Sequence, residues 1–588
     1  MTDTKQSRLT ATLLCVTPPD EHQEQGIRAF LQKKYGEDVA LTIQQDASLK
    51  SGFQLHVGSE VYDWSAKGRM EQFRQQVEQL VAKNTRKDII PLLRSSIDEF
   101  RLLAKSSEVG TVKSIGDGIA VVEGLEHAAY GEILMFDNGI KGMVQDLRRN
   151  ETGCILFDNA DDISAGSKVA RTGKTAGVPV GDAFLGRVVD ALGRPIDGGD
   201  AIPADGYRPV EEPAPGIIDR QSVDTPMETG LLSIDAMFPI GRGQRELIIG
   251  DRQTGKTAIA LDAMLNQKGK NVICVYVAIG QKASSVAQLV ENLRKRDAMD
   301  YCVVVSATAG EADTMQYIAP YAGCAMAEYY MHKGRDVLIV YDDLSKHAIA
   351  YRAMSLLLER APGREAYPGD VFYLHSRLLE RSAHLSDKLG GGSMTALPIV
   401  ETQAGDVSAY IPTNIISITA GQIFLESDLF FAGQRPAVNV GLSVSRVGGA
   451  AQTKATKKAT GSLRLDLAQY REMEVFTQFS SDLDDSTKEQ LHYGQGLMRI
   501  LRQKQYHPLS MHQQVIVLVC AMGHVLSKVA VKDVTDFRDA LLDHFEQEHS
   551  DLCRSLEDEK VLTDDMKQEI LRIAEEYLAA NAERFRKE

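Results

Sequence analysis

The sequence predicts a multidomain chain with a small α/β N-terminal domain, a β-barrel, a larger α/β domain and a C-terminal helical domain. Its 588 residues exceed what a single hydrophobic core holds. Short β runs punctuated by glycine fill residues 106–175, strands alternate with helices over 176–452, and residues 453–588 carry mainly helical patterns. We therefore expect domains at 1–83, 84–175, 176–452 and 453–588.

The first domain has a compact α/β pattern. An apolar run at 10–16 predicts a strand, and residues 27–35 then carry apolar side chains at helical spacing. Alternating apolar residues at 39–43 and 53–57 suit half-buried strands. Helical spacing returns over 70–80. The predicted order is strand, helix, strand, strand, helix.

A linker helix and a barrel are expected next. Residues 84–105 have a helical pattern, and the short β runs that follow are punctuated by glycines, which is typical of a small β-barrel. These glycines are Gly110, Gly116, Gly118, Gly124 and Gly131.

The C-terminal region supplies a helix-capping signal and the most apolar stretch of the chain. Thr563 precedes Asp564 and Asp565, which predicts an N-cap followed by an acidic first turn. The apolar stretch 515–531 is interrupted by polar residues and is short for a bilayer, so it predicts a buried helix. We expect any link to a membrane to come only through partner subunits.

The net charge, the cysteine spacing and the N-terminal segment each argue against certain functions or locations. A formal net charge of -15 argues against a nucleic-acid surface, because phosphate backbones are bound by Lys and Arg. The seven cysteines form no C-x-x-C pair, which predicts free thiols in a reducing compartment. The N-terminus lacks the apolar segment of a signal peptide, so the chain is expected on the cytoplasmic side.

One motif identifies a phosphate site. A buried apolar strand at 246–249 leads into a complete G-x-x-x-x-G-K-[ST] match, and a helix is predicted after it. Strand, glycine loop and helix together place backbone N–H groups around phosphates, so this region is predicted to be a P-loop (RecA-like) α/β nucleotide-binding domain. The predicted ATP contacts are Gly250, Asp251, Arg252, Gln253, Thr254, Gly255, Lys256 and Thr257.

A magnesium site is predicted beside this loop. The Thr257 hydroxyl is one expected ligand of Mg²⁺. The apolar strand 337–341 ends at Asp342 and Asp343, and a carboxylate at the end of a strand beside the P-loop suits the second contact. Asp342 is favoured because it follows the strand directly; the alternative is that the pair caps the next helix.

Longer motifs carry a family resemblance. These are PIGRGQR at 239–245, PGREAYPGD at 362–370 with its continuation to 377, and GLSVSRVG at 441–448. With the P-loop they resemble the alpha subunit of F-type ATP synthases over residues 84–588. The resemblance implies a hexamer that alternates with beta subunits around a gamma shaft, peripheral on the cytoplasmic side of the cell membrane, coupled to H⁺ or Na⁺.

The resemblance also assigns roles to single residues. Gln281 matches the position where the catalytic beta chain has a carboxylate; an amide orients water but is no base, so the site should bind Mg-ATP and hardly hydrolyse it. Arg446 matches the arginine finger lent to the neighbouring beta site. Around the adenine and ribose, the matching residues are Arg435, Pro436, Gln503 and Gln505. Ala420 departs from the family, which usually has Asp there.

The N-terminal domain has a resemblance of its own. The segments 46–53, 57–63 and 67–69 resemble the C-terminal part of the delta subunit of the same enzyme, which joins the head to the peripheral stalk. The resemblance implies a stalk-docking domain fused to the head; the alternative is an unrelated α/β addition.

Three other functions compete. A hexameric, nucleic-acid-dependent P-loop translocase would share the core but is opposed by the net charge and by Gln281. A catalytic export or vacuolar-type ATPase subunit would need a carboxylate at that position. A scaffold that never binds nucleotide is opposed by the intact P-loop and Asp342.

Overall fold

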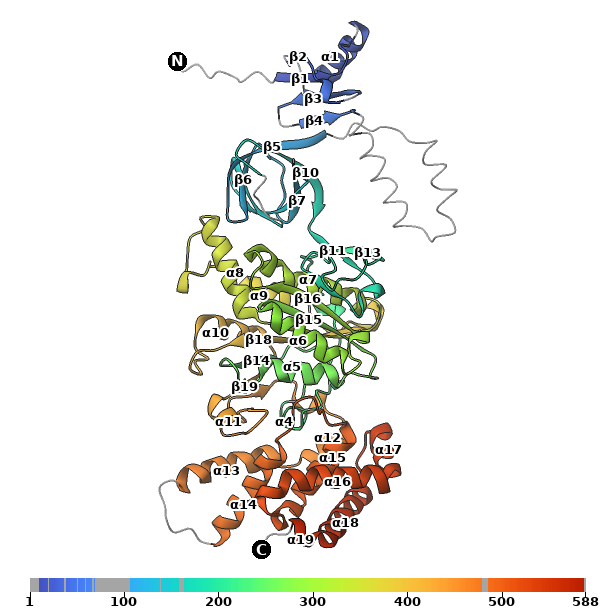
Figure 1. The fold of residues 1–588 in the computed structure, drawn as a ribbon, viewed down its shortest axis with the longest axis vertical. Coiled ribbons are helices and arrows are strands. Elements are labelled where there is room, and N and C mark those ends of the chain that lie inside the picture. The colour runs from blue at the N-terminus through green and yellow to red at the C-terminus, as the bar shows by residue number, and fades with distance from the viewer. Residues whose placement is uncertain are drawn as a thin grey trace. The chain divides into compact units, whose positions relative to one another are not determined.

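The computed structural model describes residues 10–19, 21–35, 39–49, 51–58, 60–65, 68, 106–137, 139–157, 163–477 and 485–585. The chain divides into two compact units, Met1–Ala176 with Leu357–Glu359, and Gly177–Leu356 with Arg360–Glu588. Figure 1 colours the elements in chain order. The four predicted regions are all present: an N-terminal domain, a closed barrel, a nucleotide-binding domain and a helical domain.

The N-terminal domain is a sheet with one helix against it. Strand β1 pairs in parallel with β2 and antiparallel with β3, and β3 pairs antiparallel with β4. The apolar residues of α1 pack against alternating strand residues such as Leu13 and Leu55. The elements are β1 (Thr10–Cys15), α1 (Glu21–Tyr35), β2 (Ala40–Gln45), β3 (Phe53–Val57) and β4 (Glu60–Asp63).

The predicted order of strand, helix, strand, strand is confirmed up to β3. Strand β4 was not predicted, because its four residues are too few to show a period. The helices predicted at 70–80 and 84–105 lie outside the described residues.

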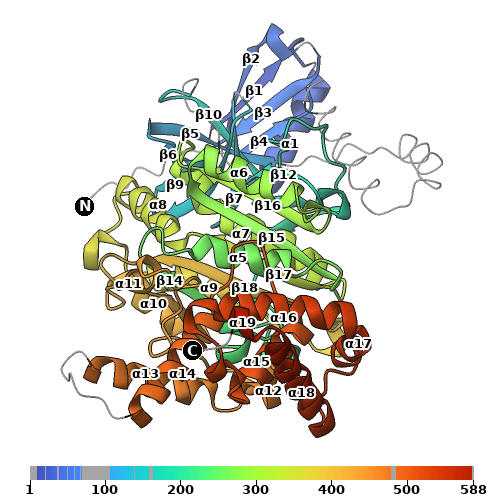
Figure 2. The same ribbon diagram turned by 60° about the horizontal axis from the view of Figure 1, so that its bottom comes forward.

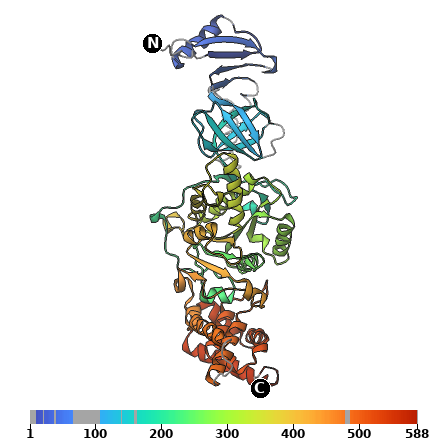
Figure 3. The same cartoon turned by 90° about the vertical axis from the view of Figure 1, so that its left-hand side faces the viewer.

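The barrel closes through six strands in the order β5-β6-β9-β8-β7-β10, with β10 also pairing to β5 (Figure 3). At Gly110 a side chain has no room, since a Cβ there would lie 2.7 Å from the Glu123 carbonyl oxygen of the neighbouring strand. The strands are β5 (Ser106–Gly116), β6 (Ile119–Glu123), β7 (Glu132–Phe136), β8 (Lys141–Leu147), β9 (Glu151–Leu156) and β10 (Lys168–Thr175).

The nucleotide-binding domain is built on a sheet in the order β12-β16-β15-β17-β18-β14-β19-β20, parallel except at β20. Helices cover the sheet, so its central strands are continuous apolar runs buried on both faces. The strands of this sheet are β12 (Val188–Asp190), β14 (Leu247–Gly250), β15 (Val272–Gln281), β16 (Cys302–Thr308), β17 (Asp336–Asp342), β18 (Ser393–Glu401), β19 (Gly421–Leu425) and β20 (Val444–Ser445). Two further strands, β11 (Gly177–Val180) and β13 (Gly206–Pro209), pair antiparallel in a separate sheet.

The helices of this domain follow the alternation that the sequence predicts. They are α4 (Leu232–Met237), α5 (Lys256–Leu265), α6 (Ala283–Arg294), α7 (Asp313–Met331), α8 (Leu344–Leu357), α9 (Val371–Leu379), α10 (Tyr410–Ile418) and α11 (Ser427–Phe431). Strands at the centre of the sheet end at one common edge, where Gly250, Gln281, Asp342 and Glu401 are the last strand residues.

The C-terminal domain is a helical bundle, drawn from orange to red in Figure 2. Its core is continuous with that of the nucleotide-binding domain. Thr563 caps α18 as predicted, accepting a hydrogen bond from the Met566 N–H. The helices are α12 (Lys454–Thr460), α13 (Leu463–Thr477), α14 (Asp485–Ile500), α15 (Met511–Met522), α16 (Val534–Glu548), α17 (Ser550–Glu559), α18 (Asp564–Ala580) and α19 (Ala582–Phe585).

The helix predicted over 515–531 is shorter than expected. Helix α15 ends at Met522, because Gly523 follows and His524 adopts a left-handed conformation with φ 59° before a 3-10 turn. Within the described ranges, no helix is long and apolar enough to cross a membrane. All seven cysteines are buried and unpaired, as expected for free thiols.

Candidate functional site

The P-loop connects the end of β14 to the start of α5. Gly255 caps α5 with φ 95°, a left-handed conformation that glycine adopts without strain. The Asp251 carboxylate fixes the loop by accepting hydrogen bonds from the Thr402 hydroxyl (2.6 Å) and the Gly405 N–H (2.9 Å). The free N–H groups at the start of α5 are therefore held in one place, as anion binding at a helix N-terminus requires.

Lys256 is a buried cation inside this loop. Its side chain is 6% exposed, and its ammonium donates to the carbonyl oxygens of Gly250 (2.9 Å) and Asp251 (2.5 Å). Burial lowers the pKa of Lys256, and the surrounding carboxylates only partly oppose this. A buried ammonium with carbonyl partners suits a site that an anionic phosphate completes.

Asp342 connects three other residues at the same edge. One carboxylate oxygen accepts from the Thr257 hydroxyl at 2.7 Å and also from the Tyr276 hydroxyl. The other accepts from Gln281 Nε2 at 2.9 Å. The hydroxyl and carboxylate oxygens of Thr257 and Asp342 are the hard ligands that Mg²⁺ prefers, so these two residues fit the predicted ion.

The strand that carries Asp342 is not the neighbour of the P-loop strand. In the sheet, β18 lies between β17 and β14. Thr257 still reaches Asp342 because α5 packs across β14, β18 and β17.

The two aspartates at the end of β17 differ in their contacts. Asp343 accepts a hydrogen bond from the Lys346 N–H at 2.7 Å, so it caps α8 as the alternative interpretation required. Burial and the charge of Asp342 raise the pKa of Asp343 to about 7. Asp342 is the one that contacts Thr257.

Sequence reasoning missed Tyr276 and Glu401 at this edge. Glu401 ends the apolar strand β18 and accepts from Arg252 Nε at 3.1 Å. An apolar strand ending in a carboxylate is the signal that identified Asp342, so Glu401 could have been found in the same way. Tyr276 lies within a buried strand and gives no such signal.

Of the residues expected around the adenine and ribose, Gln503 contacts the segment of Arg435 and Pro436. The Gln503 N–H donates to the Arg435 carbonyl at 2.9 Å, and Arg435, which precedes Pro436, stacks over the Phe430 ring at 4.3 Å. The Gln503 side chain is occupied internally: Nε2 donates to the Gly230 carbonyl (2.8 Å), and Oε1 accepts from the Leu232 N–H (2.7 Å). Gln505 is exposed.

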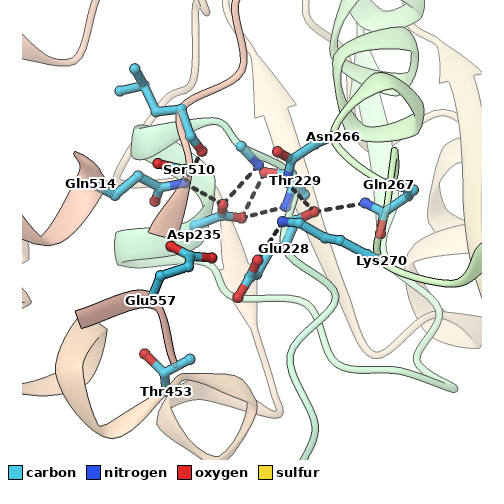
Figure 4. Close-up of polar contacts among 12 residues, drawn as sticks. Glu228, Thr229, Asp235, Asn266, Gln267, Lys270, Thr453, Ser510, Gln514 and Glu557 are labelled. Carbon is cyan, nitrogen blue, oxygen red and sulfur yellow. Dashed lines mark hydrogen bonds and ion pairs between the residues drawn. The ribbon is translucent and has the colours of Figure 1, made fainter. Parts of the chain in front are cut away.

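A hydrogen-bond network runs from Gly230, whose carbonyl accepts from Gln503, to the far end of the P-loop helix. Figure 4 shows the part of this network around Asp235 and Glu228. Asp235 accepts from Thr229 N–H and hydroxyl, from Gly230 N–H and from Gln514 Nε2 on α15. The Glu228 carbonyl accepts from Asn266 and Gln267, which follow α5. The segment from Glu228 to Asp235 thereby connects the end of the P-loop helix to Gln503 and Gln514 of the helical domain. No motif in the sequence indicated Asp235.

Arg446 follows the edge strand β20 and is exposed. Its N–H donates to the Ala420 carbonyl at 2.9 Å, and its guanidinium makes no hydrogen bond or ion pair with the described residues. The Ala420 N–H donates to the Arg245 carbonyl at 2.9 Å, so both backbone groups of Ala420 are bonded without the family's usual Asp side chain.

Family models match most of the chain. The nucleotide-binding domain of the ATP synthase alpha/beta family matches residues 230–445, the C-terminal domain of the alpha/beta chain matches 452–577, and the beta-barrel domain matches 105–173. The ATP synthase subunit alpha of Clostridium botulinum strain Hall is 57% identical over 82% of this chain and 96% of that protein. That of Clostridium kluyveri strain NBRC 12016 is 56% identical over 83% and 97%.

The chain belongs to the ATP synthase alpha subunit family. Among the functions weighed from the sequence, membership of this family favours the ATP synthase over the nucleic-acid translocase. This alpha-family chain also matches the model of the ATP synthase delta (OSCP) subunit over residues 1–77, ahead of the segments that match the alpha models. The N-terminal domain is therefore delta-like.

Proposed function

We propose that this chain is the regulatory, nucleotide-binding alpha subunit of a rotary, ion-translocating F-type ATP synthase, which binds Mg-ATP without hydrolysing it. The observation that carries the proposal is the contact of Gln281. Its amide donates to the Asp342 carboxylate at 2.9 Å, at the point where a catalytic subunit needs a proton acceptor. An amide nitrogen that donates a hydrogen bond does not take a proton from water.

The other residues of the edge act in binding. The N–H groups of the P-loop and the Lys256 ammonium hold phosphate oxygens, while Thr257 and Asp342 hold the ion. Bound Mg²⁺ neutralises charge on the phosphates. The nucleoside is bordered by Arg435, Pro436, Gln503 and Gln505. Because Gln503 is bonded to Gly230 and Leu232, its part is to fix the Arg435 segment rather than to contact the base directly.

Turnover by the isolated chain tests this proposal. We expect the purified full-length chain to bind Mg-ATP and to hydrolyse it far below the typical enzyme range of about 1–10³ s⁻¹. Equilibrium binding of ATP is measured beside phosphate release in the same samples. Turnover within that range by the chain alone would overturn the proposal, and so would a failure to bind ATP.

We further propose that Arg446 acts on the neighbouring beta subunit in a ring of alternating alpha and beta subunits around a gamma shaft. An exposed guanidinium without a partner among the described residues suits a group that completes a site on another chain. Such an arginine offsets the charge that develops on the transferred phosphoryl group. The ring lies on the cytoplasmic side of the cell membrane, is held there by its partner subunits, and is coupled to H⁺ or Na⁺.

The delta-like domain is proposed to link this head to the peripheral stalk. Torque on a rotating shaft must be resisted by a stationary connection, and fusion raises the effective concentration of the docking domain to roughly the mM range. No nucleotide contact is needed for this role.

Deletion of residues 1–83 tests the stalk role. The truncated chain should still assemble with beta subunits and hydrolyse ATP, but it should lose retention on the membrane sector and ATP-driven ion pumping. Both activities are measured with the full-length chain as the control, in membranes without a separate delta chain. Pumping equal to that of the full-length enzyme would contradict the stalk role.

A further inference from the structure

A cluster of metal-ligating side chains lies in the helical domain, apart from the P-loop edge. His512 is in the first turn of α15, Glu546 in the last turn of α16, and Cys553 and Glu557 are one turn apart on α17. One ligand atom from each of His512, Glu546 and Cys553 lies within 4.8 Å of both others. These three helices pack against one another, so the cluster joins them.

The histidine ring is held from both sides. Nδ1 lies 2.8 Å from a Glu557 oxygen, and Nε2 lies 2.7 Å from a Glu546 oxygen. The His512 N–H also donates to Glu557 at 3.0 Å, which fixes that carboxylate. A histidine whose second nitrogen donates to a carboxylate is the usual arrangement around metal-bound histidines, because it sets the ring's tautomer and orientation.

We propose that His512 Nε2, a Glu546 oxygen and Cys553 Sγ bind one divalent transition-metal ion of the Zn²⁺ class, with Glu557 holding the histidine ring. Nitrogen, thiolate and carboxylate together form a ligand set typical of Zn²⁺, and three protein ligands leave a fourth position for water. Tetrahedral coordination at these bond lengths separates nitrogen from sulfur by about 3.5 Å and nitrogen from oxygen by about 3.4 Å. The ligand atoms now lie within 4.8 Å of one another, and His512 Nε2 and the Glu546 oxygen, 2.7 Å apart, must separate to admit the ion.

The burial pattern favours an ion over a plain surface ion pair. Cys553 is 3% exposed, whereas the side chain of Glu546 is 42% exposed and free to adjust. Binding releases two protons to solvent: the Cys553 S–H bond breaks as the metal–sulfur bond forms, and the His512 Nε2–H bond that faces Glu546 breaks as the metal–nitrogen bond forms. The bound ion would fasten α15, whose Gln514 contacts Asp235, to α16 and α17.

The competing explanation is a protonated histidine that bridges two glutamates without any metal. The glutamates do raise the pKa of His512, as this explanation also requires. The two explanations differ in the role of sulfur, because only an ion engages Cys553.

Cobalt titration of the purified full-length chain, without nucleotide, separates them. We expect one Co²⁺ per chain with a thiolate-to-metal charge-transfer band in the near ultraviolet, which Zn²⁺ then removes by displacement. The oxygen ligands of the P-loop edge give no such band. Cys553→Ser should abolish the band, whereas the matched control Cys520→Ser, which changes another buried cysteine of the same domain, should retain it.

Two carboxylate variants guard against a folding defect in Cys553→Ser. Glu546→Gln alters an exposed ligand, and Glu557→Gln alters the ring's partner; each should weaken Co²⁺ binding by about 10- to 100-fold. Absence of the band in the wild-type chain, its persistence in Cys553→Ser, or wild-type affinity in both carboxylate variants would overturn the proposal in favour of the bridged histidine.

Discussion

The P-loop edge and the Arg446 segment belong to one sheet, yet they hold their polar and charged side chains in opposite ways. At the P-loop edge, Lys256, Asp342 and Gln281 are bonded to groups of the same domain. Along β20, at the border of the sheet, the Arg446 guanidinium extends from a backbone that is fixed at Ala420.

This difference agrees with the two proposed roles, in which the P-loop edge serves its own chain and Arg446 serves a neighbour. A side chain that acts within the chain is positioned by internal partners before the ligand arrives, which lowers the cost of binding. A side chain that acts on another chain needs a fixed backbone and a free end. Removing each kind should therefore have separable effects.

The largest expected effect is that of Arg446→Ala on the assembled complex. Loss of the guanidinium should lower steady-state hydrolysis by about 10³- to 10⁵-fold, because an arginine finger supplies stabilisation of that order. ATP affinity of the isolated variant should stay at the wild-type value, since Arg446 lies outside its own P-loop edge. Phosphate release by the complex and ATP binding by the free chain are the two measurements.

Arg446→Lys is the matched control for this prediction. It keeps the charge but lacks the planar fork that contacts two oxygens, so it should restore little activity. If hydrolysis survives in the alanine complex, Arg446 does not act on the neighbouring site.

Lys256→Ala should have the next largest effect. This effect concerns the chain's own P-loop edge rather than the neighbouring subunit. Removing a buried ammonium that faces phosphate should weaken ATP binding to the isolated chain by about 10- to 100-fold, the value of one or two charge-assisted hydrogen bonds. Lys268→Ala, an exposed lysine just beyond α5 that pairs with Asp297, is the control and should bind ATP normally. Equal affinity in the Lys256 and Lys268 variants would contradict the P-loop assignment.

The smallest expected effect distinguishes two glutamines of the same loop. Gln503→Ala should lower the free energy of unfolding by about 1–3 kcal/mol, because it leaves the Gly230 carbonyl and the Leu232 N–H without partners. Gln505→Ala, at an exposed position, should change it by no more than about 0.5 kcal/mol. Urea unfolding of both variants measures the difference; equal stability of the two would show that the internal contacts of Gln503 carry no weight.

The sequence predicted architecture well where a pattern repeats. Glycine-punctuated strands, the alternation of strands and helices, and the Thr563 cap depend on local spacing, which the chain displays directly. Strand β4 and the end of α15 at Met522 were missed, because four residues show no period and an apolar run does not reveal a left-handed His524.

Within the candidate site, the sequence identified the functional residues better than it identified the groups to which they are hydrogen-bonded. The P-loop motif fixes a local geometry, so its eight residues could be placed on one strand–loop–helix unit. The intervening strand β18 and the internal bonding of Gln503 depend on contacts between segments hundreds of residues apart, which a single sequence does not encode in its spacing. Family resemblance supplied Gln281 and Arg446, whose surroundings no local pattern predicts.

The buried thiols are distributed over all the domains, so their reactivity can be used to measure local unfolding of each domain. Cys15 lies in the delta-like sheet, Cys154 in the barrel, Cys324 in the nucleotide-binding domain and Cys520 in the helical bundle. Burial raises the pKa of the Cys154 and Cys520 thiols, so an alkylating reagent finds neither access nor thiolate until the surrounding domain opens. Rates of alkylation at these four sites would then rank the domains by the frequency with which each one unfolds locally, without any engineered cysteine.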